Sequence, residues 1–515
     1  MEDVRAVAAV VALSKSGDPL FENWLLQNRP LSKTKLFCEL APAWQTFQSE
    51  GTPIPNPEQT IAAVPGQEAS TPVTTQPRAS ATDERRSHLA LGSRLEAGTV
   101  GSQVWMPLID LTQHVILRAG SGGGKTVFVK RLVEEAALCG ISSIVIDTAK
   151  DLSMLGDRWP KPPASWSATD AQFAEDYFNS VDVQIWTPGH AGGRPMRLAP
   201  LPNLSGPFAE AHDRSQVVDI AVAGLLPLAA QKRNSTVEKA IIKKVVEWLT
   251  TQPQHSGNEF ERLIAALRDL PAEAFQGYQN ERKLAVGMAD RIHAALSTDS
   301  LYGGDGEELD PAKLFGVNAA RSRVSVLSLF AMPDIGTQAR FIGQLASVLF
   351  NWIRRTPSPA GSPVRGLLVL DEAARFLPRN NAESKPALML LAQQARKYGL
   401  GLILATQNPK DIDYNAIANF STQIFGTANA PQVVKFIREA MEQRGISGLN
   451  PSQLKAGQFF CATPSLDRPV RLQAPMCLSA HPHNTQLSDE DIIHRAQRSI
   501  IDGYIDKRLN GYSSQ

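Results

Sequence analysis

Short apolar runs alternate with amphipathic stretches from about residue 88 to residue 478. Such runs of aliphatic and β-branched residues are typical of buried strands. Because helical patterns fall between most of them, the sequence predicts an α/β fold with a mostly parallel sheet and helices on both faces. The predicted strands are Val115–Leu117, Ile144–Ile146, Val183–Trp186, Val324–Leu329, Leu367–Leu370, Leu402–Ala405 and Gln423–Phe425.

Residues 203–300 interrupt this alternation because their pattern is almost wholly helical. Ser235 and Glu238 have the spacing of a capping box at a helix start. We therefore predict a helical insertion that divides the sheet domain into residues 88–202 and 301–478. The apolar positions of one helix in the insertion recur every four residues at Val237, Ile241, Val245 and Leu249.

The two ends of the chain differ from this central part. Residues 1–50 mix apolar and aromatic residues and predict a small N-terminal unit, whereas residues 51–87 have the Pro, Thr, Gln, Ala and Ser content of a flexible linker. Residues 479–515 predict a C-terminal helical tail. The apolar run Ala6–Leu13 is too short to span a bilayer and follows acidic residues, so we expect a cytoplasmic protein without a membrane anchor.

The charge balance excludes a uniform polycation, since 52 Lys and Arg residues face 51 Asp and Glu residues in a chain of 515. Any binding of nucleic acid must therefore come from local patches. Segment 231–244 is one candidate, because it holds five basic residues and one acid. A helix face with that balance either follows phosphates or is an ordinary solvated face, and the sequence leaves both interpretations open. The four cysteines have no zinc-site spacing.

Residues Ala119–Thr126 read Ala-Gly-Ser-Gly-Gly-Gly-Lys-Thr, a phosphate-loop pattern with alanine where the strict pattern has its first glycine. They follow a predicted strand, His114–Arg118, and precede a predicted helix, Val127–Cys139. Glycines let the backbone N–H groups of such a loop point inward and bind anions. We expect nucleotide phosphates, by default those of ATP, to contact Gly120, Ser121, Gly122, Gly123, Gly124 and Lys125, and the Thr126 hydroxyl to ligate Mg²⁺.

Two acids, Asp371 and Glu372, end the apolar run that begins at Gly366. At the carboxyl edge of a parallel sheet such acids lie where ligands bind. We expect Asp371 to hold Mg²⁺ through water and Glu372 to act as a general base toward the attacking water. The alternative is that the pair only caps the next helix.

Three further side chains are candidates at strand or helix ends. Gln407 lies just after the strand Leu402–Ala405. We expect it to sense the γ-phosphate; the alternative is that it only begins a loop. Arg396 could reach the γ-phosphate of a neighbouring subunit, or could be a solvated cation at a helix end. Asp147, which ends another predicted strand, is either a second active-site acid or a strand-end cap.

Taken together, these residues resemble the HerA/FtsK superfamily of P-loop motor ATPases, in the branch of HerA-like bacterial proteins. The resemblance covers roughly residues 88–475. The run Ala395–Gln407 is far more diagnostic than the phosphate loop and the acid pair, which many ATPases share. The segments that carry it are Ala119–Thr126, Ile144–Leu152, Leu367–Glu372, Ala395–Gln407 and Ile417–Gly426.

The resemblance implies a RecA-like core that assembles as a hexameric ring with ATP sites between subunits. Members of the family move double-stranded DNA through the central channel, and a nuclease partner docks on the ring of HerA itself. It also implies that Lys125, Thr126, Asp371, Glu372 and Gln407 match the family's catalytic positions and that Arg396 matches its trans-acting arginine. Residues 1–87 depart from the pattern, because HerA carries an N-terminal β-barrel there.

We therefore expect an ATP-driven motor that moves on double-stranded DNA without sequence specificity. The alternative is an ATP-gated scaffold that recruits or regulates a nuclease or another effector, which the short N-terminal unit on its linker suggests. A pump for conjugative transfer with a membrane partner supplied in trans is the third hypothesis.

Overall fold

The computed structural model divides the chain into two compact units, His88–Ala496 and the combined terminal segments Met1–Ser87 and Gln497–Gln515. The predicted N-terminal unit 1–50 lies outside the described residues, as does the linker 51–87 apart from its last residue. The fold presented below is that of the unit His88–Ala496. The described residues are 87–96, 99–198, 211–229, 236–252, 259–298, 300–303, 306–332, 334–356, 363–380, 382–407, 411–445, 450–482 and 486–511.

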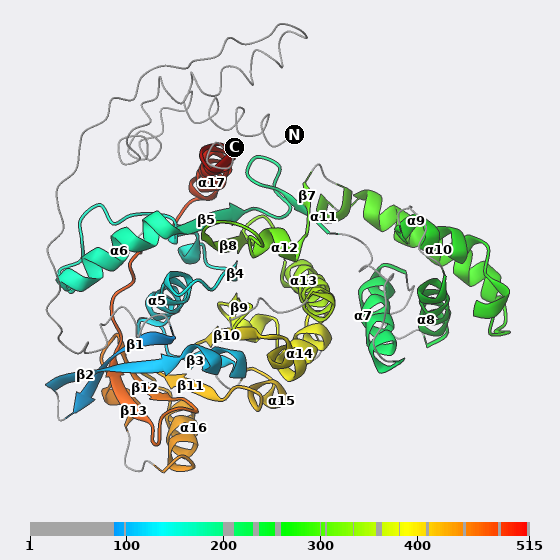
Figure 1. Ribbon diagram of the computed structural model, residues 1–515. Helices are drawn as coiled ribbons and strands as arrows, with labels where there is room; N and C mark the ends of the chain where they lie inside the picture. Colours follow the sequence, from blue (N-terminus) through cyan, green and yellow to red (C-terminus); the bar gives the residue numbers. More distant parts are fainter. Residues whose placement is uncertain are drawn as a thin grey trace, which may run out of the picture. The chain divides into compact units, whose positions relative to one another are not determined.

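One sheet of eleven strands dominates the described part of this unit, in the order β2-β1-β13-β12-β11-β3-β10-β9-β4-β8-β5 (Figure 1). The seven strands from β11 to β5 are parallel. Each of them contains or overlaps a strand predicted from its apolar run, so the α/β fold is confirmed. Their bounds are β3 Val115–Arg118, β4 Ser143–Asp147, β5 Val181–Trp186, β8 Ser322–Ser328, β9 Gly366–Leu370, β10 Leu400–Thr406 and β11 Thr422–Phe425.

Both faces of the parallel strands are buried because successive side chains alternate between two cores. Val115 and Leu117 on β3 pack with the phosphate-loop helix α5 (Lys125–Leu138), whereas Ile116 packs in the opposite core. Helix α6 (Ala168–Ser180) lies on the α5 face. Helices of the opposite core are α13 Ile335–Arg355 and α14 Lys385–Gln394, followed by the short turns η5 Ala395–Tyr398 and α15 Tyr414–Ile417.

Four antiparallel strands extend the sheet beyond β11 and were not predicted. β2 and β13 lack the continuous buried apolar runs of the parallel strands, and register shifts interrupt the pairing of β1 with β2. Helix α16 (Pro431–Glu442) packs on this end of the sheet. The strands are β1 His88–Glu96, β2 Thr99–Pro107, β12 Gln458–Ala462 and β13 Val470–Gln473.

Four helices fill most of the described part of the predicted insertion, and Figure 1 shows them grouped beside α13. Ile241, Val245 and Leu249 are buried on one face of α8, as their spacing predicts, while Ser235 lies outside the described residues. The helices are α7 Ala211–Ala229, α8 Thr236–Thr251, α9 Glu259–Arg268 and α10 Glu281–Thr298. Short elements return the chain to β8, namely α11 Ser300–Gly303, β7 Glu307–Glu308, which pairs with β6 Met196–Arg197, and α12 Pro311–Leu314.

The last helix, α17, spans Asp489–Gly511 and begins within the unit that contains the sheet. None of the helices in the described ranges combines the length and the apolar composition that crossing a bilayer requires.

Candidate active site

The phosphate loop connects the end of β3 to the start of α5. Gly122 and Gly124 have φ angles of 73° and 87°, which only glycine adopts without strain. The amide of Gly123 donates to Gly120 O at 3.1 Å, and α5 starts immediately after Gly124. The exposed tip, Ser121 and Gly122, leaves the loop open to a ligand at the N-terminus of the helix.

Two other segments brace this loop. Thr427 O accepts from Gly120 N at 2.8 Å, and the Gly457 amide donates to Gly123 O at 3.1 Å. Close packing explains why the first position of the loop is small. A Cβ on Gly426 would lie 2.6 Å from the Cβ of Ala119, so a larger residue at either position would clash. The alanine at 119 therefore fits the loop.

Lys125 lies between the two predicted acids. Its Nζ is 2.5 Å from Asp371 Oδ1 and 3.2 Å from Glu372 Oε2, and the lysine is buried with only 7% of its surface exposed. Burial by itself lowers the pKa of Lys125, but the two carboxylates more than offset it and raise the pKa above its ordinary value. The lysine is therefore a permanent cation at the carboxyl edge of the sheet.

Glu372 has an unusual backbone and a defined set of contacts. Its φ of 55° is in the left-handed region, which is uncommon for a residue other than glycine and occurs often at functional sites. Its Oε1 accepts from the Thr406 hydroxyl and from the backbone amide of Gln407, each at 3.4 Å. The carboxylate thus lies between the acid-pair strand and the tip of β10, and it makes no capping hydrogen bond to the following turn, Ala373–Arg375.

Asp147 occupies the adjacent strand end. Ile146 on β4 pairs with Leu370 on β9, so Asp147 and Asp371 follow on neighbouring strands. The Asp147 carboxylate accepts from Ser153 N at 2.8 Å and from Ser153 Oγ at 2.6 Å. Burial, partly opposed by those hydrogen bonds, and the Asp371 charge raise the pKa of Asp147 to about 6. This acid is part of the edge and also caps its own loop.

Asp151 is a residue of this edge to which the sequence analysis gave no role. Burial and the charge of Asp371 raise its pKa, whereas the charges of Lys130 and Lys125 lower it. Asp151 lies in the segment Ile144–Leu152, one of those that carry the resemblance to HerA. The order of the strands in the sheet brings it near the phosphate loop, which its spacing along the sequence does not indicate.

Gln407 and Arg396 lie at opposite ends of β10. Gln407 is exposed at the carboxyl end, beside Glu372, where a polar sensor could contact a bound nucleotide. Arg396 is exposed in η5, before the first residue of the strand. The seven residues of β10 separate the two by roughly 20 Å. This position excludes Arg396 from a role at the phosphate loop of its own chain.

Thr126 and Asp371 are the candidate ligands for Mg²⁺. The described part of the chain contains no cluster of three or more His, Cys, Asp or Glu side chains that could hold a metal. Mg²⁺ usually retains several waters and binds one or two carboxylates together with substrate phosphates, so a hydroxyl and a carboxylate at a phosphate loop suffice. The residues present fit a magnesium ion that arrives with the triphosphate.

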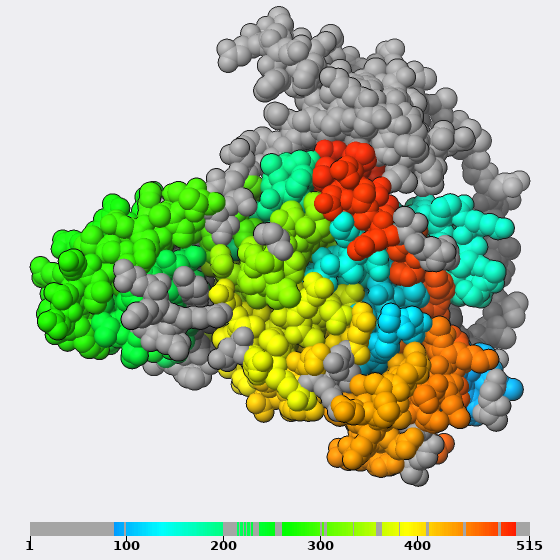
Figure 2. Space-filling view, turned by 180° about the vertical axis from the view of Figure 1, so that it is seen from behind, coloured from blue at the N-terminus to red at the C-terminus, as the bar shows by residue number. Residues whose placement is uncertain are grey.

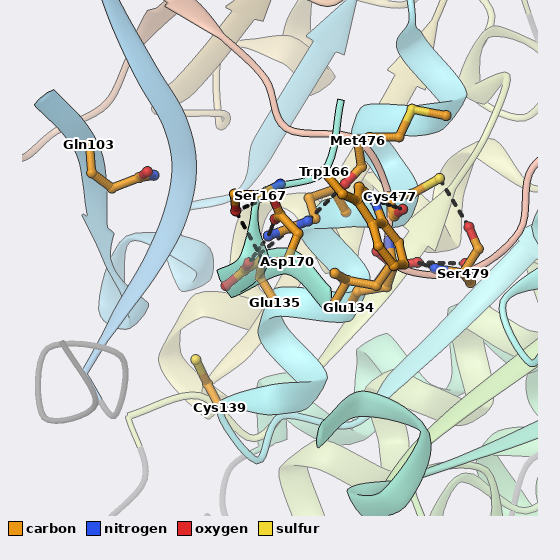
Figure 3. Close-up of polar contacts among 12 residues, drawn as sticks. Gln103, Glu134, Glu135, Cys139, Trp166, Ser167, Asp170, Met476, Cys477 and Ser479 are labelled. Atoms are coloured by element: carbon orange, nitrogen blue, oxygen red, sulfur yellow. Dashed lines mark hydrogen bonds and ion pairs between the residues drawn. The ribbon is translucent and has the colours of Figure 1, made fainter. Parts of the chain in front are cut away.

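A C-terminal segment, Met476–Ala480, lies against the middle of α5 and forms what we call the strap. Figure 3 shows Glu134 facing it, with Oε2 accepting from Leu478 N at 2.6 Å and Oε1 from Ser479 N at 2.8 Å. The Trp166 indole donates to Cys477 O at 3.3 Å. Further contacts to the strap come from Lys130 to Ala480 O, Arg131 to Met476 O and Trp159 to Cys477 O. The strap thus fixes the helix that presents Lys125.

In the described part of the basic segment 231–244, two of the three lysines are paired and Lys239 is exposed. Lys243 pairs with Asp219 at 2.8 Å, and Lys244 pairs with Glu247 at 2.7 Å. Residues 231–235 lie outside the described residues. These pairs favour the interpretation of a solvated helix face for the described end of the segment.

No protein-family model matches the chain. Two curated sequences are similar to part of it. The Probable DNA double-strand break repair helicase HerA of Methanocaldococcus jannaschii is 34% identical over 118 residues, 23% of each chain. The DNA double-strand break repair helicase HerA of Saccharolobus solfataricus is 26% identical over 126 residues, 24% of this chain and 25% of that one. These matches confirm the predicted resemblance to HerA over the matched regions.

The matched regions span about a quarter of the length of these HerA relatives. Among solved structures, the bacterial conjugative coupling protein TrwBdeltaN70 is 12% identical with a TM-score of 0.48, covering 78% of this chain and 93% of that chain. VirB4 of Thermoanaerobacter pseudethanolicus is 15% identical with a TM-score of 0.47, covering 77% of this chain and 97% of that chain.

Proposed function

We propose that the protein is an ATP-hydrolysing motor that assembles as a ring and translocates on double-stranded DNA. The observation that carries the proposal is the position of Lys125, held between Asp371 and Glu372 at the carboxyl edge of the sheet. A cation on an anion-binding loop, next to two acids on another strand, is the arrangement that phosphoryl transfer requires.

ATP is the substrate in this proposal. The amides of Gly122 to Lys125 bind the β- and γ-phosphates, and Lys125 exchanges its carboxylate partners for the γ-phosphate. Thr126 and Asp371 would hold Mg²⁺, which would neutralise part of the triphosphate charge. The strap on α5 keeps Lys125 in place during this exchange, because it anchors the helix one to three turns away.

Glu372 accepts a proton from the attacking water, and its contacts support this role. The Thr406 hydroxyl and the Gln407 amide orient its Oε1, while Lys125 contacts its Oε2. When Lys125 turns to the γ-phosphate, Oε1 stays held by its two donors and Oε2 is released to take the proton. The Gln407 side chain is exposed at the same edge and serves as the γ-phosphate sensor.

Arg396 completes the site of a neighbouring subunit. Its exposed position at the opposite end of β10 supports a role in trans, since the chain cannot bring it to its own phosphate loop without unfolding the strand. A closed ring, by default a hexamer, supplies each site with one such arginine. The two similar relatives are named as DNA repair helicases, which supports duplex DNA as the track.

Steady-state ATP hydrolysis with and without duplex DNA tests this proposal. We expect turnover that rises with duplex DNA at moderate salt and is lost in Lys125→Ala and Glu372→Gln. Turnover that is the same with and without duplex DNA at every salt concentration would contradict the motor. The scaffold alternative rests on residues 1–87, of which the structure describes only the last, and the comparisons do not favour it.

A further inference from the structure

A basic notch lies at the antiparallel end of the sheet, away from the phosphate loop. It is a cavity of about 390 Å³ lined by eight residues of β1, of β13 with the preceding loop, and of the turn after α16. Three of the eight are arginines, and one is an acid. The lining residues are Arg94, Leu95, Glu96, Gly445, Arg468, Pro469, Val470 and Arg471.

The charges of these arginines are only partly neutralised. Arg94 is 3.6 Å from Glu96, a long and largely exposed pair. Arg471 donates to Gln458 Oε1 at 2.7 Å, and its Nε is buried without a hydrogen-bond partner. Arg468 is exposed. The lining residues therefore carry a net formal charge of +2 in a chain whose total is +1.

The strand beside the notch exposes several polar side chains. Figure 2 shows the orange β12–β13 region next to the blue hairpin residues at the lower right. The first five residues of β2, Thr99–Gln103, are exposed and include threonine, serine and glutamine. Such side chains donate to phosphate oxygens alongside arginine.

We propose that the notch binds a phosphodiester group of the DNA backbone, as an anchoring contact separate from the ATP site. The proposal rests on the proposed function, in which duplex DNA is the track. A guanidinium group can form two parallel hydrogen bonds to phosphate oxygens, and these contacts do not depend on the DNA sequence. Such contacts suit a motor that moves along DNA of any sequence. The notch also supplies the local basic patch that the near-zero net charge demands.

An acidic protein partner fits the notch less well. Its volume is at the lower end of the roughly 300–1,000 Å³ of small-ligand sites, enough for a phosphate with adjoining sugar. Arg94 comes from β1, whereas Arg468 and Arg471 come from β13 and the loop before it. The three border one cavity and do not form an extended stripe along which an acidic helix could lie.

Fluorescence anisotropy of a labelled duplex with the full-length chain tests the proposal. The variants are Arg468→Gln and the double variant Arg94→Gln/Arg468→Gln. The matched control is Arg197→Gln, an exposed arginine that pairs with Glu308 elsewhere. We expect the double variant to weaken duplex binding about tenfold and to reduce the slope of log affinity against log salt by about 0.9 for each phosphate that the protein no longer neutralises. ATP turnover without DNA should equal that of the control.

Competition with inorganic phosphate and with polyglutamate identifies the bound group. If polyglutamate binds the wild type and loses affinity in the variants while duplex binding is unchanged, the notch is a protein-docking site and the proposal is overturned. The proposal is also overturned if the double variant binds duplex with the affinity and salt slope of Arg197→Gln. In that case the proposed motor function still stands, provided that duplex DNA stimulates ATP turnover. A wild type that neither binds duplex nor responds to it overturns both.

Discussion

The ammonium nitrogen of Lys125 lies 2.5 Å from Oδ1 of Asp371, so the phosphate-loop cation is bound to the acid that should hold magnesium. A triphosphate must compete with this carboxylate for the lysine. The pair keeps two buried charges satisfied before the nucleotide arrives, because either charge alone would be costly at this depth.

Asp371→Asn should therefore tighten nucleotide binding in the absence of Mg²⁺ while impairing hydrolysis in its presence. The variant frees Lys125 and removes a negative charge near the phosphates, and we expect about tenfold higher affinity for ATP in EDTA. Titration of a fluorescent ATP analogue measures this. Asp219→Asn, at an exposed pair, is the control and should bind like the wild type. Weaker binding in EDTA would show that the ion pair does not compete with the nucleotide.

Glu372→Gln should reduce hydrolysis by about 10²–10⁴-fold, because the proton acceptor is lost. ATP should bind at least as tightly as to the wild type, because one of the two carboxylates that contact Lys125 is gone. Thr406→Val should lower the rate less, because it removes one of the two donors that orient Oε1. Single-turnover hydrolysis and a binding titration separate the two effects. Equal rates for Glu372→Gln and the wild type would require a different base.

His114 should make stability pH-dependent. Burial, more than the nearby Arg396 charge, lowers its pKa from 6.5 to about 4, partly offset by its contact with Ala392 O. The unfolded chain then takes up a proton at a higher pH than the folded chain, so stability present above pH 6.5 is lost as the pH falls toward 4. The loss should reach about 2 kcal/mol at pH 5.

Urea unfolding of wild type and His114→Gln at pH 7.5 and 5 isolates this contribution. Asp147 acts in the opposite direction, because its raised pKa adds stability on acidification through pH 6. It is common to both proteins and cancels in the difference. The wild type should lose more stability than the variant on acidification. If wild type and His114→Gln lose the same free energy of unfolding between pH 7.5 and pH 5, the imidazole is not neutral and buried.

Glu134→Gln should destabilise the fold by about 1–3 kcal/mol, because an amide nitrogen would face one of the strap's donors. Chemical unfolding measures the cost. Glu175→Gln, at an exposed pair with Arg158, should change stability by less than about 0.5 kcal/mol. Equal stabilities of the two variants would mean that the strap contributes little to the stability of the fold.

The positions of the parallel strands and of the phosphate loop could be predicted from the sequence. A strand that is covered on both faces is a continuous apolar run, and the phosphate loop is a local motif. The sequence was insufficient for β1, β2, β12 and β13. Polar residues interrupt the apolar pattern of β1, β2 and β13, and these strands are defined by their antiparallel partners. Asp151 near the phosphate loop, and the contact of Thr406 with Glu372, depend on strand order, which sequence spacing does not encode. The roles of the phosphate loop, Asp371, Glu372, Gln407 and Arg396 stay predictions.

Mixing two inactive variants tests most directly whether the ATP site is shared between subunits. Lys125→Ala lacks the phosphate-loop cation and Arg396→Ala lacks the trans arginine, so each alone should hydrolyse ATP at background. In an equimolar mixture, about a quarter of the interfaces combine an intact lysine with an intact arginine, and DNA-stimulated turnover should recover to about that fraction of wild type. Lys397→Ala, one residue along the same turn, should be active alone. No recovery on mixing, or full activity of Arg396→Ala alone, would contradict the account.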